Sequence, residues 1–195
     1  MSRKKPGTVR IIGGSDRGRR LPVPDLPGLR PSGDRSRETL FNWLAPHIRG
    51  ARCVDLFAGT GVLGFEAASR GAQSVVMIEK AAQAAKSIRQ NLATLNAGQP
   101  GRAIELVQGD ALAWLETCKP QSLDIVFVDP PFDSGLQSLT MTALAQGDCM
   151  SEGGLVYLET ARQAGSLELD PAWEVLKEKT LGDVCMHLFR KNKII

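Results

Sequence analysis

The sequence predicts an α/β fold in which helices cover both faces of a mostly parallel sheet. From Arg52 onward, short apolar runs alternate with segments of helical period, and this alternation is typical of such folds. At 195 residues, of which 43% are hydrophobic, the chain suits one domain of ordinary size with an appendage. Its net charge of +3 combines a basic start with an acidic body.

The basic residues concentrate at the start of the chain. Residues 1–37 hold ten Lys or Arg and three Asp, a local charge of +7, and the remainder carries −4. Residues 9–12 and 17–21, separated by two glycines, are expected to form a short hairpin within a basic arm over residues 1–31. Such an arm attracts the phosphates of a nucleic acid. The candidate contacts are Arg10, Arg17, Arg19, Arg20, Arg30 and Arg37.

The second predicted region, residues 32–195, contains the α/β body. A Pro-rich connection over residues 22–31 leads to a helix that begins near residues 32–34 and carries Leu40, Phe41 and Leu44 on its apolar side. Apolar runs predict strands at residues 53–57, 74–78, 103–107, 123–128 and 154–159. A helix is expected over residues 81–95, and residues 173–180 and 184–190 are expected to form a closing hairpin.

Several classes of protein are disfavoured by what the sequence lacks. No apolar run is long enough to span a bilayer, and the basic first residues are not followed by a secretory segment, so we expect a cytoplasmic protein that contacts no membrane. Four scattered cysteines and two histidines support neither a disulfide framework nor a metal site, and no metal is expected. Nothing in the sequence indicates an obligate dimer, so we expect a monomer.

A glycine-rich turn follows the first strand of the body. Gly59, Gly61 and Gly64 satisfy the pattern G-x-G-x-x-G, and Glu79 follows about 20 residues later, as in sites for nicotinamide cofactors. Asp55, however, lies just before the glycines, where it would repel a pyrophosphate but attract the ammonium and sulfonium groups of S-adenosylmethionine (SAM). The pattern therefore favours SAM.

Acids end three successive predicted strands, at the edge where open α/β sheets bind ligands. Glu79 is expected to accept hydrogen bonds from the ribose hydroxyls of SAM, and Asp110, followed by Ala111, from its adenine amino group. Each acid has an alternative role as a helix N-cap or turn residue, and this alternative is strongest for Asp110.

The run Asp-Pro-Pro-Phe at residues 129–132 ends the fourth strand and indicates chemistry on an amino group attached to a flat ring. Asp129 offers a carboxylate acceptor, Pro130 a backbone carbonyl and Phe132 a face for stacking, while Pro131 stiffens the turn. The alternative is an ordinary Pro-Pro turn followed by a core Phe. Because the chain begins with a basic arm, a nucleic acid is the expected carrier of the amine.

Taken together, these motifs resemble those of a known family. Residues 55–61, Glu79, Asp110 and residues 129–132, preceded by the block Arg30-Pro-Ser-Gly-Asp-Arg-Ser-Arg-Glu-Thr-Leu-Phe-Asn-Trp-Leu44, resemble the RsmD-type 16S ribosomal RNA guanine methyltransferases. The block is the most specific part, although Ser32 stands where the family has Thr. The resemblance implies a Rossmann-like seven-stranded SAM-dependent methyltransferase fold whose last two strands are antiparallel.

The resemblance also implies an activity and a set of contacts. Methyl would pass from SAM to the exocyclic 2-amino group of one guanine in 16S ribosomal RNA, either free or in an assembling small subunit. The implied contacts with SAM are Asp55, Gly59, Thr60, Gly61, Glu79, Asp110 and Ala111, and those with the base are Asp129, Pro130, Pro131 and Phe132. Ser32 and Arg35 are assigned to the carboxylate of SAM, with RNA as the alternative.

Two other interpretations remain open from the residues alone. An Asp-Pro-Pro-Phe turn serves any planar amine, so the substrate could instead be adenine or cytosine in DNA or another RNA, or a protein glutamine. The basic arm disfavours a protein substrate. A nucleic-acid-binding protein that keeps this fold without catalysis is the alternative from a different class.

Overall fold

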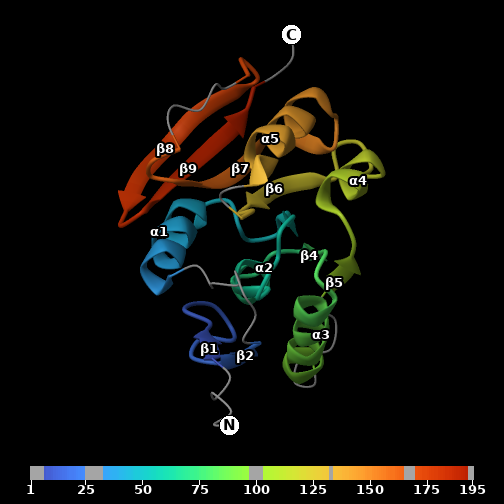
Figure 1. Cartoon of the computed structure of the whole chain (residues 1–195), viewed down its shortest axis with the longest axis vertical. Helices are drawn as coiled ribbons and strands as arrows, with labels where there is room; N and C mark the ends of the chain where they lie inside the picture. The colour runs from blue at the N-terminus through green and yellow to red at the C-terminus, as the bar shows by residue number, and fades with distance from the viewer. Residues whose placement is uncertain (1–6, 25–32, 97–102, 132–133, 165–169, 193–195) are drawn as a thin grey trace.

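A computed structural model describes residues 7–24, 33–96, 103–131, 134–164 and 170–192. These residues form a small hairpin, a larger sheet and the helices that cover it (Figure 1). The elements are β1 Gly7–Arg10, β2 Arg20–Val23, α1 Asp34–Leu44, β3 Arg52–Asp55, α2 Val62–Ser69, β4 Ser74–Glu79, α3 Ala82–Asn96, β5 Ala103–Gln108, α4 Ala111–Glu116, β6 Leu123–Val128, α5 Leu136–Gln146, β7 Met150–Ala161, β8 Trp173–Leu181 and β9 Val184–Lys191.

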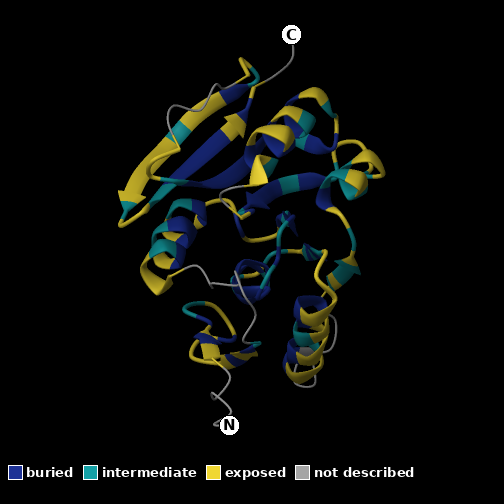
Figure 2. Cartoon of the chain, viewed as in Figure 1, coloured by how far each residue is buried: buried dark blue, intermediate teal, exposed yellow. Residues whose placement is uncertain are grey.

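The larger sheet has seven strands in the order β5-β4-β3-β6-β7-β9-β8. Its first five strands pair in parallel, and β9 and β8 are added antiparallel. This arrangement confirms the predicted α/β class and the Rossmann-like order with an antiparallel end. The inner strands are buried, whereas the outer strand β8 is mostly exposed (Figure 2). The predicted ranges of β4, β5 and β6 agree closely with the structure, and β7 extends beyond its predicted range at both ends.

Alternate residues of β6 belong to different apolar clusters. Ile125 and Phe127 lie in the cluster that contains α1, α2 and α3 residues, and the ring of Phe127 lies 5.9 Å from that of Phe41. Val126 and Val128 lie in the other cluster, with residues of α4 and α5. Because both faces of β6 are covered, its residues from Ile125 to Val128 are all apolar and do not alternate with polar ones.

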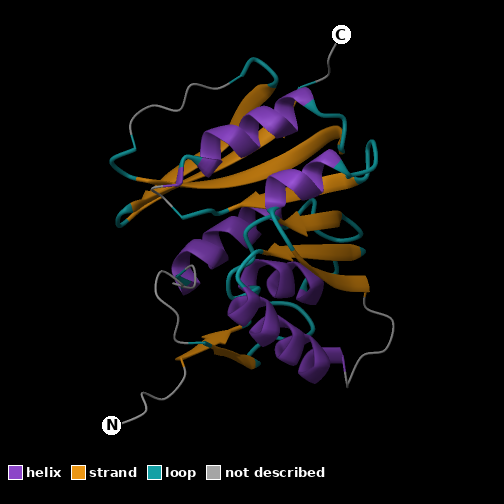
Figure 3. Ribbon diagram, turned by 45° about the vertical axis from the view of Figure 1, so that its right-hand side comes forward, coloured by secondary structure: helices purple, strands orange, loops and turns teal. Residues whose placement is uncertain are grey.

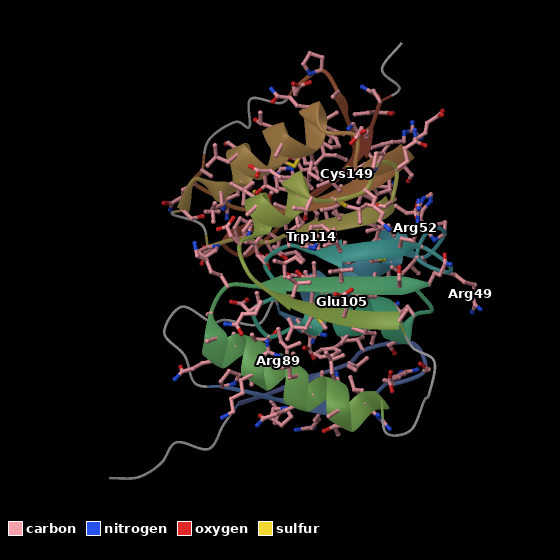
Figure 4. The ribbon with its side chains drawn as sticks, turned by 90° about the vertical axis from the view of Figure 1, so that its right-hand side faces the viewer. Arg49, Arg52, Arg89, Glu105, Trp114 and Cys149 are labelled. Atoms are coloured by element: carbon pink, nitrogen blue, oxygen red, sulfur yellow. The ribbon has the colours of Figure 1, made fainter. Side chains whose placement is uncertain are left out.

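An ion pair joins three strands at the edge where they begin. The guanidinium of Arg52 donates to both carboxylate oxygens of Asp124, at 2.9 and 2.8 Å, and the Ser151 hydroxyl donates to the same carboxylate at 2.8 Å. These hydrogen bonds connect β3, β6 and β7 and lower the pKa of Asp124. Figure 4 shows Arg52 beside Arg49 on this side of the molecule. The contact fixes the register of β3, β6 and β7 relative to one another.

The hairpin of β1 and β2 covers α2 on the side away from the sheet (Figure 3). Val9, Ile11 and Leu21 belong to the same apolar cluster as Phe65 of α2, so the helix is buried around most of its circumference. The contact is close at Gly14, where a Cβ atom would lie 1.9 Å from the Ser69 carbonyl oxygen. The hairpin is therefore packed onto the body, and the predicted boundary between residues 31 and 32 lies outside the described residues.

The strands of the hairpin differ from the predicted ranges 9–12 and 17–21. Gly7 pairs with Val23 and Arg10 with Arg20, which places the strands farther from the turn than expected. Residues 11–19 form a loop that binds the end of α2. The Ser15 backbone N–H donates to the Ser69 carbonyl at 2.8 Å, so this tertiary contact competes with a tight turn at the glycines.

A buried carboxylate, Glu66, holds the hairpin loop against α2. It accepts hydrogen bonds from the backbone N–H groups of Ile12 at 2.8 Å and Gly13 at 2.7 Å. It also accepts from Arg70 at 2.8 Å and lies 3.5 Å from the buried guanidinium of Arg37. A buried carboxylate with this many partners stabilises the fold only while all of them remain in place.

Replacing Glu66 should therefore loosen the hairpin. Glu66→Ala leaves two partly buried N–H groups without an acceptor and removes a carboxylate from a buried guanidinium, so we expect the free energy of unfolding to fall by about 3–5 kcal/mol. Urea denaturation measures this loss. Glu38→Ala, on the exposed side of α1, is the matched control and should leave the urea midpoint close to that of the wild type. Equal midpoints for the two variants would contradict this role of Glu66.

Candidate active site

Acidic side chains gather where neighbouring strands end. Asp55 is the last residue of β3 and Glu79 the last of β4, while Asp129 follows β6, on the other side of β3. The strands β4, β3 and β6 are parallel neighbours, so these carboxylates share the carboxyl edge of the sheet. Asp129 and Glu79 both raise the pKa of Asp55, which is consistent with this placement.

Asp55 is the most buried of these acids, with 1% of its surface exposed. The Gly64 backbone N–H donates to Oδ2 at 3.2 Å, whereas Oδ1 has no hydrogen-bond partner among the residues that the structure describes. Burial, more than the nearby negative charges, raises its pKa to about 7. A buried carboxylate with an unpaired oxygen favours a ligand that brings a positive charge or a donor.

The glycine-rich turn lies beside Asp55. Gly61 has φ +76°, and a Cβ atom there would lie 2.8 Å from the Phe65 ring, so only glycine fits without displacement. Thr60 is buried, and its hydroxyl accepts from the Val62 backbone N–H at 3.4 Å. The turn thus leads directly into α2, and a ligand could approach the backbone N–H groups at the start of this helix.

Glu79 is oriented by the turn. Its Oε2 accepts from the Gly59 backbone N–H at 2.7 Å, and its Oε1 accepts from the Ala81 N–H at 2.6 Å. Each carboxylate oxygen can accept a further hydrogen bond, so the half-buried side chain is held in place and can still bind a pair of hydroxyl groups.

Asp110 occupies the N-cap of α4. Its Oδ1 accepts from the backbone N–H groups of Leu112 at 3.0 Å and Ala113 at 3.2 Å, and these bonds, together with Lys80, lower its pKa. Lys80 donates to Oδ2 at 3.2 Å from a side chain that is 80% exposed. The structure supports the N-cap role, and a ligand contact at Oδ2 would have to displace Lys80. Ala111, the next residue, is buried.

The turn after β6 is fastened to the first turn of α5. The Pro131 carbonyl accepts from the Ser134 hydroxyl at 2.6 Å and from the Gln137 side-chain amide at 3.5 Å. Asp129 is half-buried and Pro130 is buried, at the same edge as Asp55. Phe132 lies outside the described residues, so its stacking role stays a prediction.

One acid at this edge was missed by the sequence analysis. Glu159 lies on β7, whose register pairs Leu158 with Val128, so the next residues, Glu159 and Asp129, are neighbours. The Tyr157 hydroxyl donates to Glu159, and burial and the charge of Asp129 raise the pKa of Glu159 to about 8. An apolar run that ends in Glu was the available signal, but its significance depends on the strand order.

The predicted RNA contacts differ in how accessible they are. Arg10, Arg17, Arg19 and Arg20 are exposed, with Arg10 3.4 Å from Asp34 and Arg19 3.5 Å from Asp16. The prediction that Arg37 contacts RNA is wrong, because only 1% of Arg37 is exposed and its guanidinium donates to the Arg10 carbonyl at 2.8 Å. Arg35 is exposed on α1, while Arg30 and Ser32 lie outside the described residues.

A cavity of about 570 Å³ lies at the opposite edge, beside Arg49, Arg70 and Gln73. The strands β4 and β5 begin there, whereas open α/β sheets bind ligands at the carboxyl ends of their strands. We therefore assign the candidate site to the edge with Asp55 and Asp129. Among the described residues no group of three His, Cys, Asp or Glu side chains could hold a metal ion, and no helix has the length and apolarity to cross a membrane.

Solved structures of other proteins have the same fold over nearly the whole of this chain. A proposed methyltransferase of Escherichia coli has a TM-score of 0.83 and 42% identity, and covers 95% of this chain and 99% of its own. A proposed methylase of Haemophilus influenzae has a TM-score of 0.82 and 37% identity, covering 96% and 100%. The fold and the acidic carboxyl edge thus define a Rossmann-like methyltransferase.

The sequence comparisons narrow this class. The family described as Conserved hypothetical protein 95 matches residues 9–190. The ribosomal RNA small subunit methyltransferase D of Escherichia coli is 44% identical over 97% of this chain and 96% of its own length, and that of Haemophilus influenzae is 41% identical over 94% of each. The chain belongs to the ribosomal RNA small subunit methyltransferase D family, as its motifs predicted.

The burial of Asp55 has a consequence for stability. Its folded-state pKa of about 7 exceeds the ordinary value of 3.8, so ionisation favours the unfolded chain as the pH rises between these values. Asp55→Asn should therefore raise the free energy of unfolding relative to the wild type. This gain should grow by about 1.4 kcal/mol per pH unit from pH 4 to pH 7 and stay constant above pH 7. Urea denaturation across this range measures the gain, and exposed Asp148→Asn is the control. A gain that does not change with pH would contradict the assignment.

Proposed function

We propose that this chain transfers a methyl group from SAM to the exocyclic 2-amino group of a guanine in small-subunit ribosomal RNA. The observation that carries the proposal is the placement of Asp55 and Asp129 on neighbouring strand ends, beside a glycine-rich turn. Asp55 suits a cationic cofactor, and Asp129 begins the Asp-Pro-Pro-Phe turn that suits a planar amine. The names of the relatives support ribosomal RNA as the carrier.

The residues present fit SAM better than a nicotinamide cofactor. The unpaired Oδ1 of Asp55 favours an ammonium or sulfonium group and disfavours a pyrophosphate. Gly59, Gly61 and Glu79 would hold the amino-acid end and the ribose. When bound, SAM supplies a methyl group on a positively charged sulfur, which an amine nitrogen can attack. Thr60, Asp110, Ala111, Ser32 and Arg35 complete the proposed cofactor contacts.

The turn at residues 129–132 positions the amine. Asp129 and the Pro130 carbonyl accept its two hydrogens, which directs the nitrogen lone pair away from them, and Phe132 stacks on the base. Pro131, fastened to α5 through its carbonyl, keeps the turn rigid. A weak carboxylate is a sufficient base, because the methylated nitrogen is cationic until it loses its proton. Orientation contributes most to the rate.

The exposed arginines of the hairpin supply the RNA contacts in this proposal. Arg10, Arg17, Arg19 and Arg20 neutralise phosphates, and the packing of the hairpin on α2 places them at a defined position relative to the glycine-rich turn. Arg30, which lies outside the described residues, is proposed as a further contact. We propose that the protein acts in the cytoplasm as a monomer, on 16S ribosomal RNA or an assembling small subunit.

Transfer of tritiated methyl from SAM tests the substrate directly. We expect label in 16S ribosomal RNA or in small-subunit particles, released as N2-methylguanine after digestion, and none in duplex DNA or protein. Label on adenine or cytosine would replace guanine in the proposal, and label in DNA would replace the carrier. Absence of label from every substrate would favour a binding protein without catalysis.

Asp129 should be required for turnover and dispensable for the cofactor. Asp129→Ala removes the acceptor that orients the amine, so kcat should fall by at least about a hundredfold. Calorimetry should show nearly unchanged affinity for SAM, since Asp55 and Glu79 remain. Turnover close to that of the wild type would remove Asp129 from the mechanism.

The hairpin should control RNA affinity and its salt dependence. The double variant Arg17→Gln, Arg20→Gln should bind RNA more weakly, and the slope of log affinity against log salt should become shallower by about 1.5. Fluorescence anisotropy with labelled RNA at several salt concentrations measures both. Lys177→Gln, Lys179→Gln changes the same charge on β8, the exposed outer strand of the sheet, and should retain the wild-type slope. Equal slopes for the two double variants would exclude the hairpin as the RNA contact.

A further inference from the structure

The Tyr157 and Glu159 pair of β7 has no role in the function proposed above. Both side chains are buried, with Glu159 4% exposed and Tyr157 fully enclosed. The Tyr157 hydroxyl donates to Oε1 of Glu159. A carboxyl group that is buried to this degree is expensive to keep ionised.

Glu159 lies next to the proposed acceptor of the amine hydrogens. The parallel register pairs Val126 with Val156 and Val128 with Leu158, so the residues that follow, Asp129 just after β6 and Glu159 within β7, lie side by side. Side chains alternate between the faces of a strand, so Glu159 lies on the same face as Tyr157, two residues before it. Asp129 shares a face with Phe127 in the same way, and Phe127 and Tyr157 belong to one apolar cluster. The negative charge of one ionised carboxylate disfavours ionisation of its neighbour, so Asp129 and Glu159 do not both ionise easily.

The surroundings determine which of the two carries the proton. In the described ranges, the groups that act on the charge of Glu159 are Asp129 of β6 and Tyr157 of its own strand. From β9 its partner is Met186, and α1 covers this face with apolar side chains. Asp129 is the more exposed of the two acids, so ionisation is easier there.

We propose that Glu159 is a positioning residue that holds a proton beside Asp129, so that Asp129 is the ionised member of the pair and keeps a fixed orientation toward the amine. Tyr157 fixes Glu159 by donating to one oxygen, and the other oxygen carries the proton. The proton that the amine loses in each turnover goes to Asp129 and then to water, and that of Glu159 is not consumed. The inference rests on the proposed role of Asp129.

Two substitutions of Glu159 distinguish the effect of its protonation from the effect of its size and shape. Glu159→Gln keeps a neutral side chain and an oxygen for Tyr157, whereas Glu159→Ala removes both. We expect Glu159→Ala to lower kcat by about a hundredfold and Glu159→Gln to restore most of this loss, with SAM affinity unchanged by calorimetry in both. Glu105→Gln, exposed on β5, is the matched control. If Gln is as damaging as Ala while circular dichroism shows both to be folded, an ionised carboxylate is required and the proposal is wrong.

The pH dependence supplies a readout that a purely structural role would not change. Burial and Asp129 raise the pKa of Glu159 to about 8, so in the wild type kcat should fall as Glu159 ionises above that pH. Glu159→Gln cannot ionise and should lack this fall. Identical profiles for the two proteins would overturn the proposal.

A titration without substrate tests the coupling of the two acids independently of activity. Carbon-13 NMR of the labelled Glu159 carboxyl should give a midpoint near 8, and Asp129→Asn should lower it by about one pH unit or more. An unchanged midpoint would contradict the pairing. Should the wild type transfer no methyl to RNA, the proposed function would fail, while this titration would still decide whether Glu159 holds the proton.

Discussion

The structure depends on one buried carboxylate, Glu66, which joins the hairpin to the body. Its oxygens accept from two backbone N–H groups of the hairpin loop and from Arg70, and Arg37 of α1 adds a further positive charge. Because α2 begins at the glycine-rich turn, whatever fixes α2 also fixes the edge where the acids gather. Glu66 therefore connects the basic hairpin with the acidic edge through a single short helix.

The acidic side chains at the carboxyl edge of the sheet repel one another when they are ionised. Asp55 and Glu159 are both buried, and the pKa of each is raised by burial and by Asp129. The burial of the apolar clusters on both faces of the sheet offsets the cost of burying these acids. Such a concentration of negative charge is understandable where a cationic ligand is to be bound, and a site of this kind is stabilised by its ligand.

The sequence predicted the body of the fold better than its attachments. The strands β4, β5 and β6 are rich in apolar residues, so their positions followed from composition. Asp55, Glu79 and Asp129 could be placed at the carboxyl ends of β3, β4 and β6. The strands of the hairpin lie farther from the turn than predicted, because the contact of its loop with Ser69 is invisible in sequence. Arg37 was misassigned because its burial depends on Glu66, a residue 29 positions away. Glu159 was missed because its importance appears only when β7 is known to lie beside β6.

The clamp of Arg52, Asp124 and Ser151 has a consequence at the far end of the strands. It sets the displacement of β3, β6 and β7 at the edge where they begin, and strands are stiff over so few residues. Since side chains alternate between faces, a slip of one residue in β6 would turn Asp129 away from Asp55 to the opposite face. The relative placement of Asp55 and Asp129 is thus decided at the opposite end of the sheet, where the strands begin.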